Sequence, residues 1–186
     1  LDTNLIISVG ADFFTFTRLR TAGNFKFPVE TSDYFFGVNS ALKTKLFGDD
    51  FFVRLRLAHI SSHLGDGMAS DGVFSDKPFV YSREFIDVVA AIKRNNFRVY
   101  LGATLLFHSI PDEFSAIIPQ VGIEYSYPIN NWIEFIVGID NKLTGKRNNT
   151  INTYSAQLGL SFNTSENIGL FVGAYYYNGY SMHGMY

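Results

Sequence analysis

The chain has 186 residues, of which 47% are apolar and 17% aromatic, and it carries a formal net charge of −2 and no cysteine. The near-neutral charge and the scattered acidic and basic residues argue against nucleic-acid binding, and the lack of cysteine excludes disulfides and thiolate metal sites. No apolar run reaches the roughly 18 to 20 residues of a transmembrane helix, and no signal peptide opens the sequence. Because the first residue is Leu1, we expect a processed or trimmed start.

Apolar and polar residues alternate along nine segments, which is the two-residue repeat of a β-strand. In the fifth segment, for example, Val99, Leu101 and Ala103 alternate with Arg98 and Thr104. Each segment has roughly the 9 to 11 residues that cross a bilayer as a tilted strand. The nine segments lie at residues 7–14, 36–46, 53–63, 86–93, 98–108, 120–127, 133–142, 154–162 and 169–177.

The connections between these segments alternate between short and long. Short turns are expected at residues 48–50, 94–96, 128–131 and 163–166, and longer links at 21–32, 62–81, 109–115 and 143–150. This asymmetry is typical of outer-membrane barrels, which have short periplasmic turns and longer extracellular loops. The pattern therefore predicts an all-β fold, a transmembrane up-and-down antiparallel β-barrel.

The two faces of the predicted strands differ in chemistry. Lys or Arg facing hydrocarbon at the bilayer midplane costs about 2 to 4 kcal/mol, so we expect the charged residues to point into the lumen and pair there. A narrow barrel filled in this way is not an open pore. The charged residues concerned are Lys43, Lys45, Arg54, Arg56, Asp87, Arg98, Glu124, Glu134 and Asp140. Aromatic residues next to the short turns fit an interfacial girdle: Phe47, Phe51, Phe97, Tyr125, Tyr127, Trp132 and Phe162.

Nine strands are an odd number, whereas bacterial single-chain barrels normally have an even number. We therefore expect residues 1–186 to be a single outer-membrane barrel domain that continues past Tyr186. Whether it also begins before Leu1 is left open.

The third segment changes character along its length. Its apolar face, from Val53 to Leu57, continues into His59, Ser61 and His63. A serine needs an adjacent base to become nucleophilic, and the base needs a carboxylate to fix its tautomer. Glu84 opens the next segment on the same outward face, which predicts Ser61 as nucleophile, His59 as base and Glu84 as the orienting carboxylate. In the alternative interpretation these polar residues only mark the level at which the strands leave the hydrocarbon.

Four stretches of the sequence resemble a family of outer-membrane barrels of Gram-negative bacteria that is catalogued as domain of unknown function 1207. They are HISSHLGD at 59–66, YSRE at 81–84, QVGIEYSYP at 120–128 and GYSMHG at 179–184. The resemblance covers nearly the whole chain and implies further strands on both sides, about 10–12 in the complete protein. It implies location and architecture but no chemistry. The sequence departs from the family pattern in two places. Gly67 stands where an acidic residue is usual, and the loop at 68–78 is unusual.

A second resemblance is local. The His59-Ile60-Ser61 tripeptide is similar to the His-x-Ser motif of outer-membrane lipid A deacylases, which works with a glutamate on the following strand. The similarity implies that an acyl ester of the outer leaflet would reach Ser61, His59 and Glu84 from the lipid side.

Three functions remain open from the sequence: a non-enzymatic structural or surface-partner role, a lipid A or phospholipid acyl-ester hydrolase, and a small-solute channel. The expected partners are outer-membrane lipid and lipopolysaccharide, with another membrane or surface protein left open.

No cofactor or metal is expected, because Asp66, Asp71 and Asp76 lack the spacing of a calcium loop. His108 and His183 stand alone in the sequence and are interpreted as lumen or loop residues.

Overall fold

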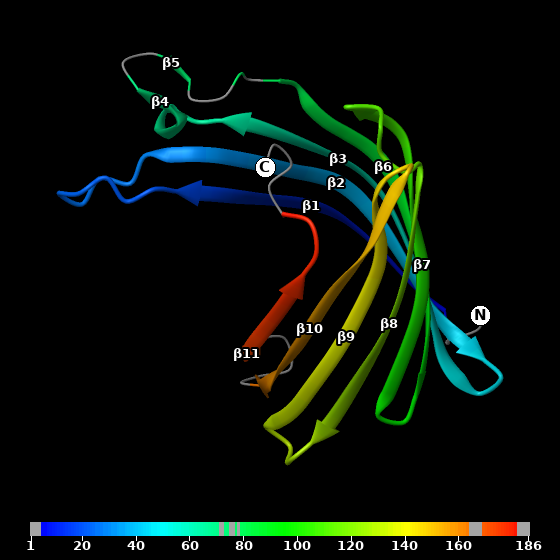
Figure 1. Ribbon diagram of the computed structural model, residues 1–186. Coiled ribbons are helices and arrows are strands. Elements are labelled where there is room, and N and C mark those ends of the chain that lie inside the picture. The colour runs from blue at the N-terminus through cyan, green and yellow to red at the C-terminus, as the bar shows by residue number, and fades with distance from the viewer. Residues whose placement is uncertain (1–4, 71–72, 75–76, 78, 164–168, 182–186) are drawn as a thin grey trace.

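A computed structural model describes residues 5–70, 73–74, 77, 79–163 and 169–181 of the chain. One antiparallel sheet contains nine strands in the order β1-β2-β3-β6-β7-β8-β9-β10-β11, and two short strands pair separately. The sheet curls into a half-barrel whose edges are β1 and β11 (Figure 1). The strands are β1 (Ile6–Leu19), β2 (Val29–Leu46), β3 (Asp49–Leu64), β4 (Ala69–Ser70), β5 (Val73–Phe74), β6 (Tyr81–Arg94), β7 (Phe97–Ile110), β8 (Ile117–Pro128), β9 (Ile133–Lys146), β10 (Asn149–Asn163) and β11 (Gly169–Asn178).

The prediction of an all-β, up-and-down antiparallel arrangement is confirmed, because each main strand pairs with the next main strand along the chain. All nine alternating segments lie in these strands, which are mostly longer than expected, from 10 residues in β11 to 18 in β2. The described part of the chain contains one short 3-10 helix, η1 (Asp66–Met68), in the link between β3 and β6. It contains no helix long and apolar enough to span a membrane.

Two of the expected short turns are two-residue hairpins. Phe47 and Gly48 connect β2 to β3 with φ values of 52° and 89°, the positive φ at both positions that a tight hairpin turn of type I′ requires. Asn95 and Asn96 connect β6 to β7, with Asn95 at φ 52°. The expected turn at 163–166 includes residues 164–166, which lie outside the described residues.

The prediction of a long link at residues 143–150 is wrong. β9 continues to Lys146 and β10 begins at Asn149, so that only two residues connect them. The polar residues of this segment, such as Thr144 and Asn149, still occupy paired positions of the ladder. The polarity of the segment predicted a loop, but polar residues pair in a ladder through their main chain as apolar residues do.

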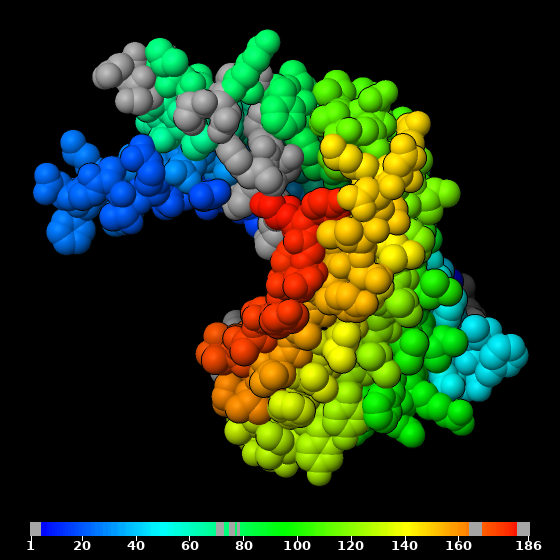
Figure 2. All heavy atoms as spheres, in the orientation of Figure 1, coloured from blue at the N-terminus to red at the C-terminus, as the bar shows by residue number. Residues whose placement is uncertain are grey.

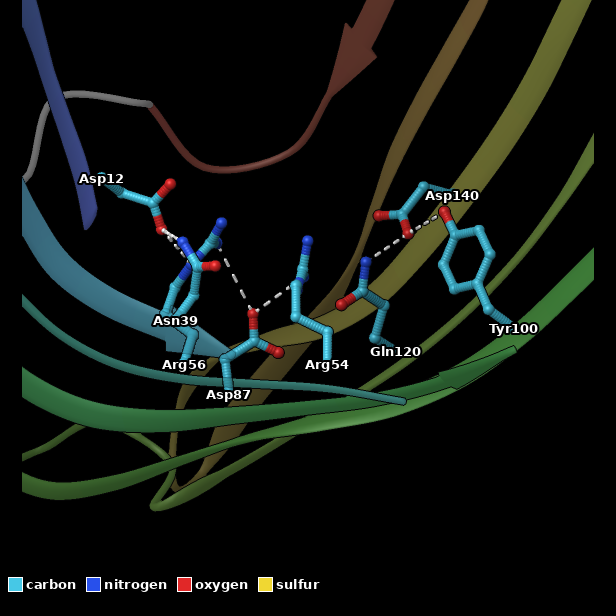
Figure 3. A network of polar contacts seen from close by, with 8 residues as sticks. All are labelled: Asp12, Asn39, Arg54, Arg56, Asp87, Tyr100, Gln120 and Asp140. Carbon is cyan, nitrogen blue, oxygen red and sulfur yellow. Dashed lines mark hydrogen bonds and ion pairs between the residues drawn. The ribbon is translucent and has the colours of Figure 1, made fainter. Parts of the chain in front are cut away.

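The convex face of the curled sheet is apolar and exposed. Leu101 is 68% exposed, Val99 50% and Ile123 42%. The concave face carries ionic side chains, and several of them pair there (Figure 3). Of the nine charged residues expected to pair, Glu134 and Asp140 form no ion pair among the described residues, and Asp140 accepts hydrogen bonds instead. Pairs on this face are Arg56 with Asp12 at 2.8 Å, Arg54 with Asp87 at 3.2 Å, Lys45 with Asp50 at 2.6 Å and Arg98 with Glu124 at 2.7 Å.

A tyrosine lying over a glycine extends this polar network across the sheet. Tyr100 of β7 is opposite Gly122 of β8, and its hydroxyl donates to Asp140 of β9 at 2.7 Å. Gln120 donates to the same carboxylate at 2.5 Å. A Cβ atom at Gly122 would lie 2.2 Å from Cζ of Tyr100, so only glycine lets the ring cross at this position.

The half-barrel surrounds a hollow that is open between the β1–β2 hairpin and β11 (Figure 2). Few apolar side chains of the described residues are buried, and they are Ala58, Tyr81, Phe85, Val89, Ala91 and Ile118. At the end of β6, the Arg83 guanidinium lies 3.7 Å from the centre of the Phe114 ring. Ionic and aromatic contacts, rather than a large apolar core, therefore organise the concave side.

Candidate functional site

Two of the predicted site residues meet on the convex face. His59 of β3 and Glu84 of β6 are directly opposite in the antiparallel register. Nδ1 of His59 lies 2.6 Å from Oε1 of Glu84, and both side chains are partly exposed. The ring of Phe36 stacks on His59 with a centroid distance of 4.7 Å, so the imidazole is held between a carboxylate and an aromatic face.

The predicted nucleophile lies two residue pairs further toward the long loops. Ser61 is opposite Ser82 in the register, and its hydroxyl lies 3.3 Å from Nε2 of His63. Among the contacts of the described residues, Ser61 therefore belongs with His63, and a Ser61–His59 hydrogen bond is not formed. The structure brings together the base and the carboxylate of the predicted triad, while the serine contacts a different imidazole.

A third residue, which the sequence did not predict, belongs to this site. Nδ1 of His108 in β7 contacts Oε2 of Glu84 on the convex face. The prediction that His108 is an isolated lumen or loop residue is wrong, because the register shifts between Glu84 and Phe85. Glu84 pairs with His108 and Phe85 with Leu106, which leaves Phe107 as the extra residue of a β-bulge. Simple alternation would place His108 on the concave face, and the bulge places it on the convex face instead.

Glu84 is the centre of this group. Besides the two histidines, Ser82 donates its hydroxyl hydrogen to Oε1 at 2.8 Å. An ionised carboxylate only accepts hydrogen bonds, so Nδ1 of both His59 and His108 must carry the hydrogen. Nε2 of each neutral ring is then an acceptor, and it becomes a donor when the ring is protonated. We call Glu84, His59, His108 and Ser82 the histidine–carboxylate cluster.

An open apolar groove of about 510 Å³ lies beside this cluster on the convex face. It is lined by Phe36, Gly37, Val38, Leu57, Ala58, His59, Glu84 and Phe107. One end of the groove is therefore polar and the rest is apolar.

The described residues contain no group of three or more histidine or acidic side chains that could hold a metal ion. Of the acidic loop residues considered from the sequence, Asp66 begins the short helix η1. Asp71 and Asp76 lie outside the described residues, and so does His183. No cation site can be built from the part of this loop that the structure describes.

The fold and the site together define a class of protein: an antiparallel half-barrel with paired ions on its concave face and a histidine–carboxylate cluster on its convex face. Residues 24–186 match the family described as Protein of unknown function (DUF1207), and the chain belongs to this family. The expected family resemblance is thereby confirmed, although the match carries no location, no activity and no likeness to lipid A deacylases. Searches of curated proteins and of solved structures each gave no match.

Proposed function

We propose that this chain is part of an integral outer-membrane β-barrel of Gram-negative bacteria with a filled lumen, in a structural or surface-partner role. The observation that carries the proposal is the division of the sheet into an exposed apolar convex face and an ionic concave face. Apolar surface left in water costs about 25 cal/mol per Å², and contact with lipid would remove this cost. The ionic residues would face the lumen.

The order of side chains along the strands supports a lipid boundary. Neighbouring positions on β3, β6 and β7 form rows across the convex face, and an apolar row is followed by a polar row toward the long loops. These two rows are Leu57–Ile86–Leu105 and His59–Glu84–His108. A change from hydrocarbon to headgroups at this level would match the change in chemistry.

Exposed aromatic residues at the tight-turn end support a second boundary. Phe47 is 97% exposed, and Phe97, Tyr127 and Trp132 are also exposed. Aromatic side chains are typical of membrane–water interfaces, where the ring is apolar and the surroundings are polar. The two ends of the strands would thus lie at the two surfaces of the membrane.

A matched pair of arginine substitutions tests the proposal. We expect Leu101→Arg, on the convex face, to destabilise the protein folded in phospholipid vesicles by about 2 to 4 kcal/mol. Ser155→Arg is the control, because Ser155 lies opposite Asp140 on the concave side and gives the new cation a carboxylate. Folding can be followed by urea titration in vesicles, together with fractionation of the bacterial envelope. Equal effects of the two substitutions, or a protein absent from the outer-membrane fraction, would contradict the proposal.

A second candidate function is hydrolysis of a lipid acyl ester, which the 2.6 Å contact between His59 and Glu84 favours. In this reaction Ser61 Oγ would attack the ester carbonyl while an imidazole takes its proton and passes it to the departing alcohol. Water would then release the fatty acid from the serine. The contact of Ser61 with His63 instead of His59 favours the non-enzymatic role.

Mass spectrometry of lipid A and phospholipids separates the two functions. Membranes with the wild-type protein are compared with membranes that carry the Ser61→Ala variant or no protein. The non-enzymatic proposal expects identical acyl chains in all three samples. Acyl chains that are lost only with the wild-type protein would establish the hydrolase instead.

A further inference from the structure

The groove on the convex face has a backbone floor. Gly37 and Ala58 are opposite each other in the register, and their side-chain positions point to the concave side together with those of Asn39 and Arg56. On the convex side, only main chain of these two residues lies between the side chains of their neighbours, and Ala58 is 5% exposed, so these neighbours nearly cover the floor. The result is a shallow channel with apolar walls, formed without any deletion or break in the sheet.

The β-bulge contributes to both parts of this channel. Because Phe107 is the extra residue, Phe107 and His108 face the convex side one after the other. Phe107 is 61% exposed and forms one wall of the groove, while His108 contacts Glu84 at its polar end. One local irregularity therefore places an apolar wall and a polar group beside each other, as bulges near functional sites do.

The polar end of the groove suits a ligand with hydrogen-bonding groups. Nδ1 of His59 and of His108 is committed to Glu84, which leaves Nε2 of each ring to meet a ligand. The stacked Phe36 ring fixes the orientation of the His59 imidazole. A protonated ring would donate to a phosphate oxygen, and a neutral ring would accept from a hydroxyl or an amine.

We propose that this groove binds one phospholipid, with an acyl chain over Gly37 and Ala58 and the phosphate-bearing headgroup at His59 and His108. The inference rests on the proposed membrane location. Its support is the order of the parts, since the apolar stretch lies toward the middle of the strands and the polar end toward the long loops. A phospholipid whose headgroup lies at the level of the long loops would have the same order. The groove has its floor on β2 and β3 and is bounded by Glu84 of β6 and Phe107 of β7, and its volume of about 510 Å³ is small beside the several acyl chains of lipid A.

A groove-filling variant tests the acyl-chain part. The full protein, purified in detergent, is mixed with phosphatidylglycerol or phosphatidylethanolamine, and retained lipid is measured by native mass spectrometry. We expect the wild-type protein to retain one phospholipid. Leu57→Trp should weaken retention about tenfold, the effect of excluding about two methylene groups. Leu55→Trp is the matched control, because Leu55 has the same exposure on the same face but does not line the groove.

A ring substitution tests the headgroup part. His108→Phe keeps the aromatic bulk and removes both ring nitrogens, so retention should fall about tenfold, the effect of losing one hydrogen bond to a charged group. Lipid A added in place of phospholipid should not be retained. Retention of lipid A instead of phospholipid, or unchanged retention by His108→Phe, would overturn the assignment of the headgroup site.

The outcomes also separate this inference from the proposed function. If the protein inserts into vesicles, but the wild type, Leu57→Trp and Leu55→Trp all retain phospholipid equally well, the proposed lipid groove is overturned and the membrane location is not. A wild-type protein that does not insert at all would overturn both proposals, since the groove would then face water.

Discussion

Removing the carboxylate of Asp87 is the most direct test of how the concave face is held together. This side chain is 8% exposed and lies 3.2 Å from Nη2 of Arg54 and 3.8 Å from Nη1 of Arg56 (Figure 3). In the variant Asp87→Asn the charge disappears while the shape is kept. Arg56 retains Asp12 at 2.8 Å, so Arg54 is the residue that loses its charged partner.

The size of the effect follows from the contacts and their burial. A hydrogen bond to a charged group contributes about 1.5 to 3 kcal/mol, and removing one partner of a fully buried pair costs about 3 to 5 kcal/mol. The Arg54 side chain is 41% exposed, and solvent screens part of the interaction. We therefore expect Asp87→Asn to lower the free energy of unfolding by about 2 kcal/mol.

Asp50→Asn provides the matched control. Asp50 is on the same concave face, but its partners Lys43 and Lys45 are about half exposed, and exposed pairs contribute little. Urea titration of the folded protein, followed by the fluorescence of its single tryptophan, Trp132, compares the midpoints at constant m value. If Asp50→Asn destabilised the protein as much as Asp87→Asn, burial of the ionic network would not be what sets its strength.

Three further outcomes are expected. Gly122→Ala should destabilise the protein by about 1 to 3 kcal/mol in the same titration, because the new methyl group displaces Tyr100, whereas at Gly138 the nearest atom to an added Cβ lies 3.5 Å away and alanine should be tolerated. Deleting Phe107 should remove the bulge and leave His108 opposite Glu84 on the convex face, because His108 would then follow Leu106 directly in the ladder. The ¹⁵N spectrum of its ring would keep the signature of a carboxylate partner, and loss of that signature would contradict the assignment of Phe107 as the extra residue. Planar bilayers containing the protein should show no conductance, and regular single-channel steps would refute the filled lumen.

The fold could be predicted from the sequence because one physical rule, alternation with a period of two, holds along most of every main strand. The phase of that alternation determines which face each residue of β3 and β6 occupies, so the sequence alone places His59 and Glu84 on one face. The same rule failed for the segment at 143–150. There polar residues continue the ladder, and composition does not distinguish a polar strand from a loop.

His108 could not be predicted because a β-bulge changes the phase by one residue. The sequence contains a local indication of it, since Leu105, Leu106 and Phe107 are three apolar residues in succession and interrupt the alternation. Such a run also occurs in strands that are apolar on both faces, so the run alone does not locate the bulge. The pairing of Ser61 with His63 was missed for a different reason. It depends on side-chain rotamers, which the strand pattern does not determine.

The histidine–carboxylate cluster is difficult to explain by stability alone. A carboxylate on an otherwise apolar face is costly to desolvate, and the donors from His59, His108 and Ser82 offset this cost without exceeding it by much. Packed apolar residues at the same positions would hold three strands together at least as well. The cluster also occupies the row where the convex face changes from apolar to polar, beside a groove open to the surroundings. Its two outward ring nitrogens are therefore best explained by contact with a molecule outside the sheet.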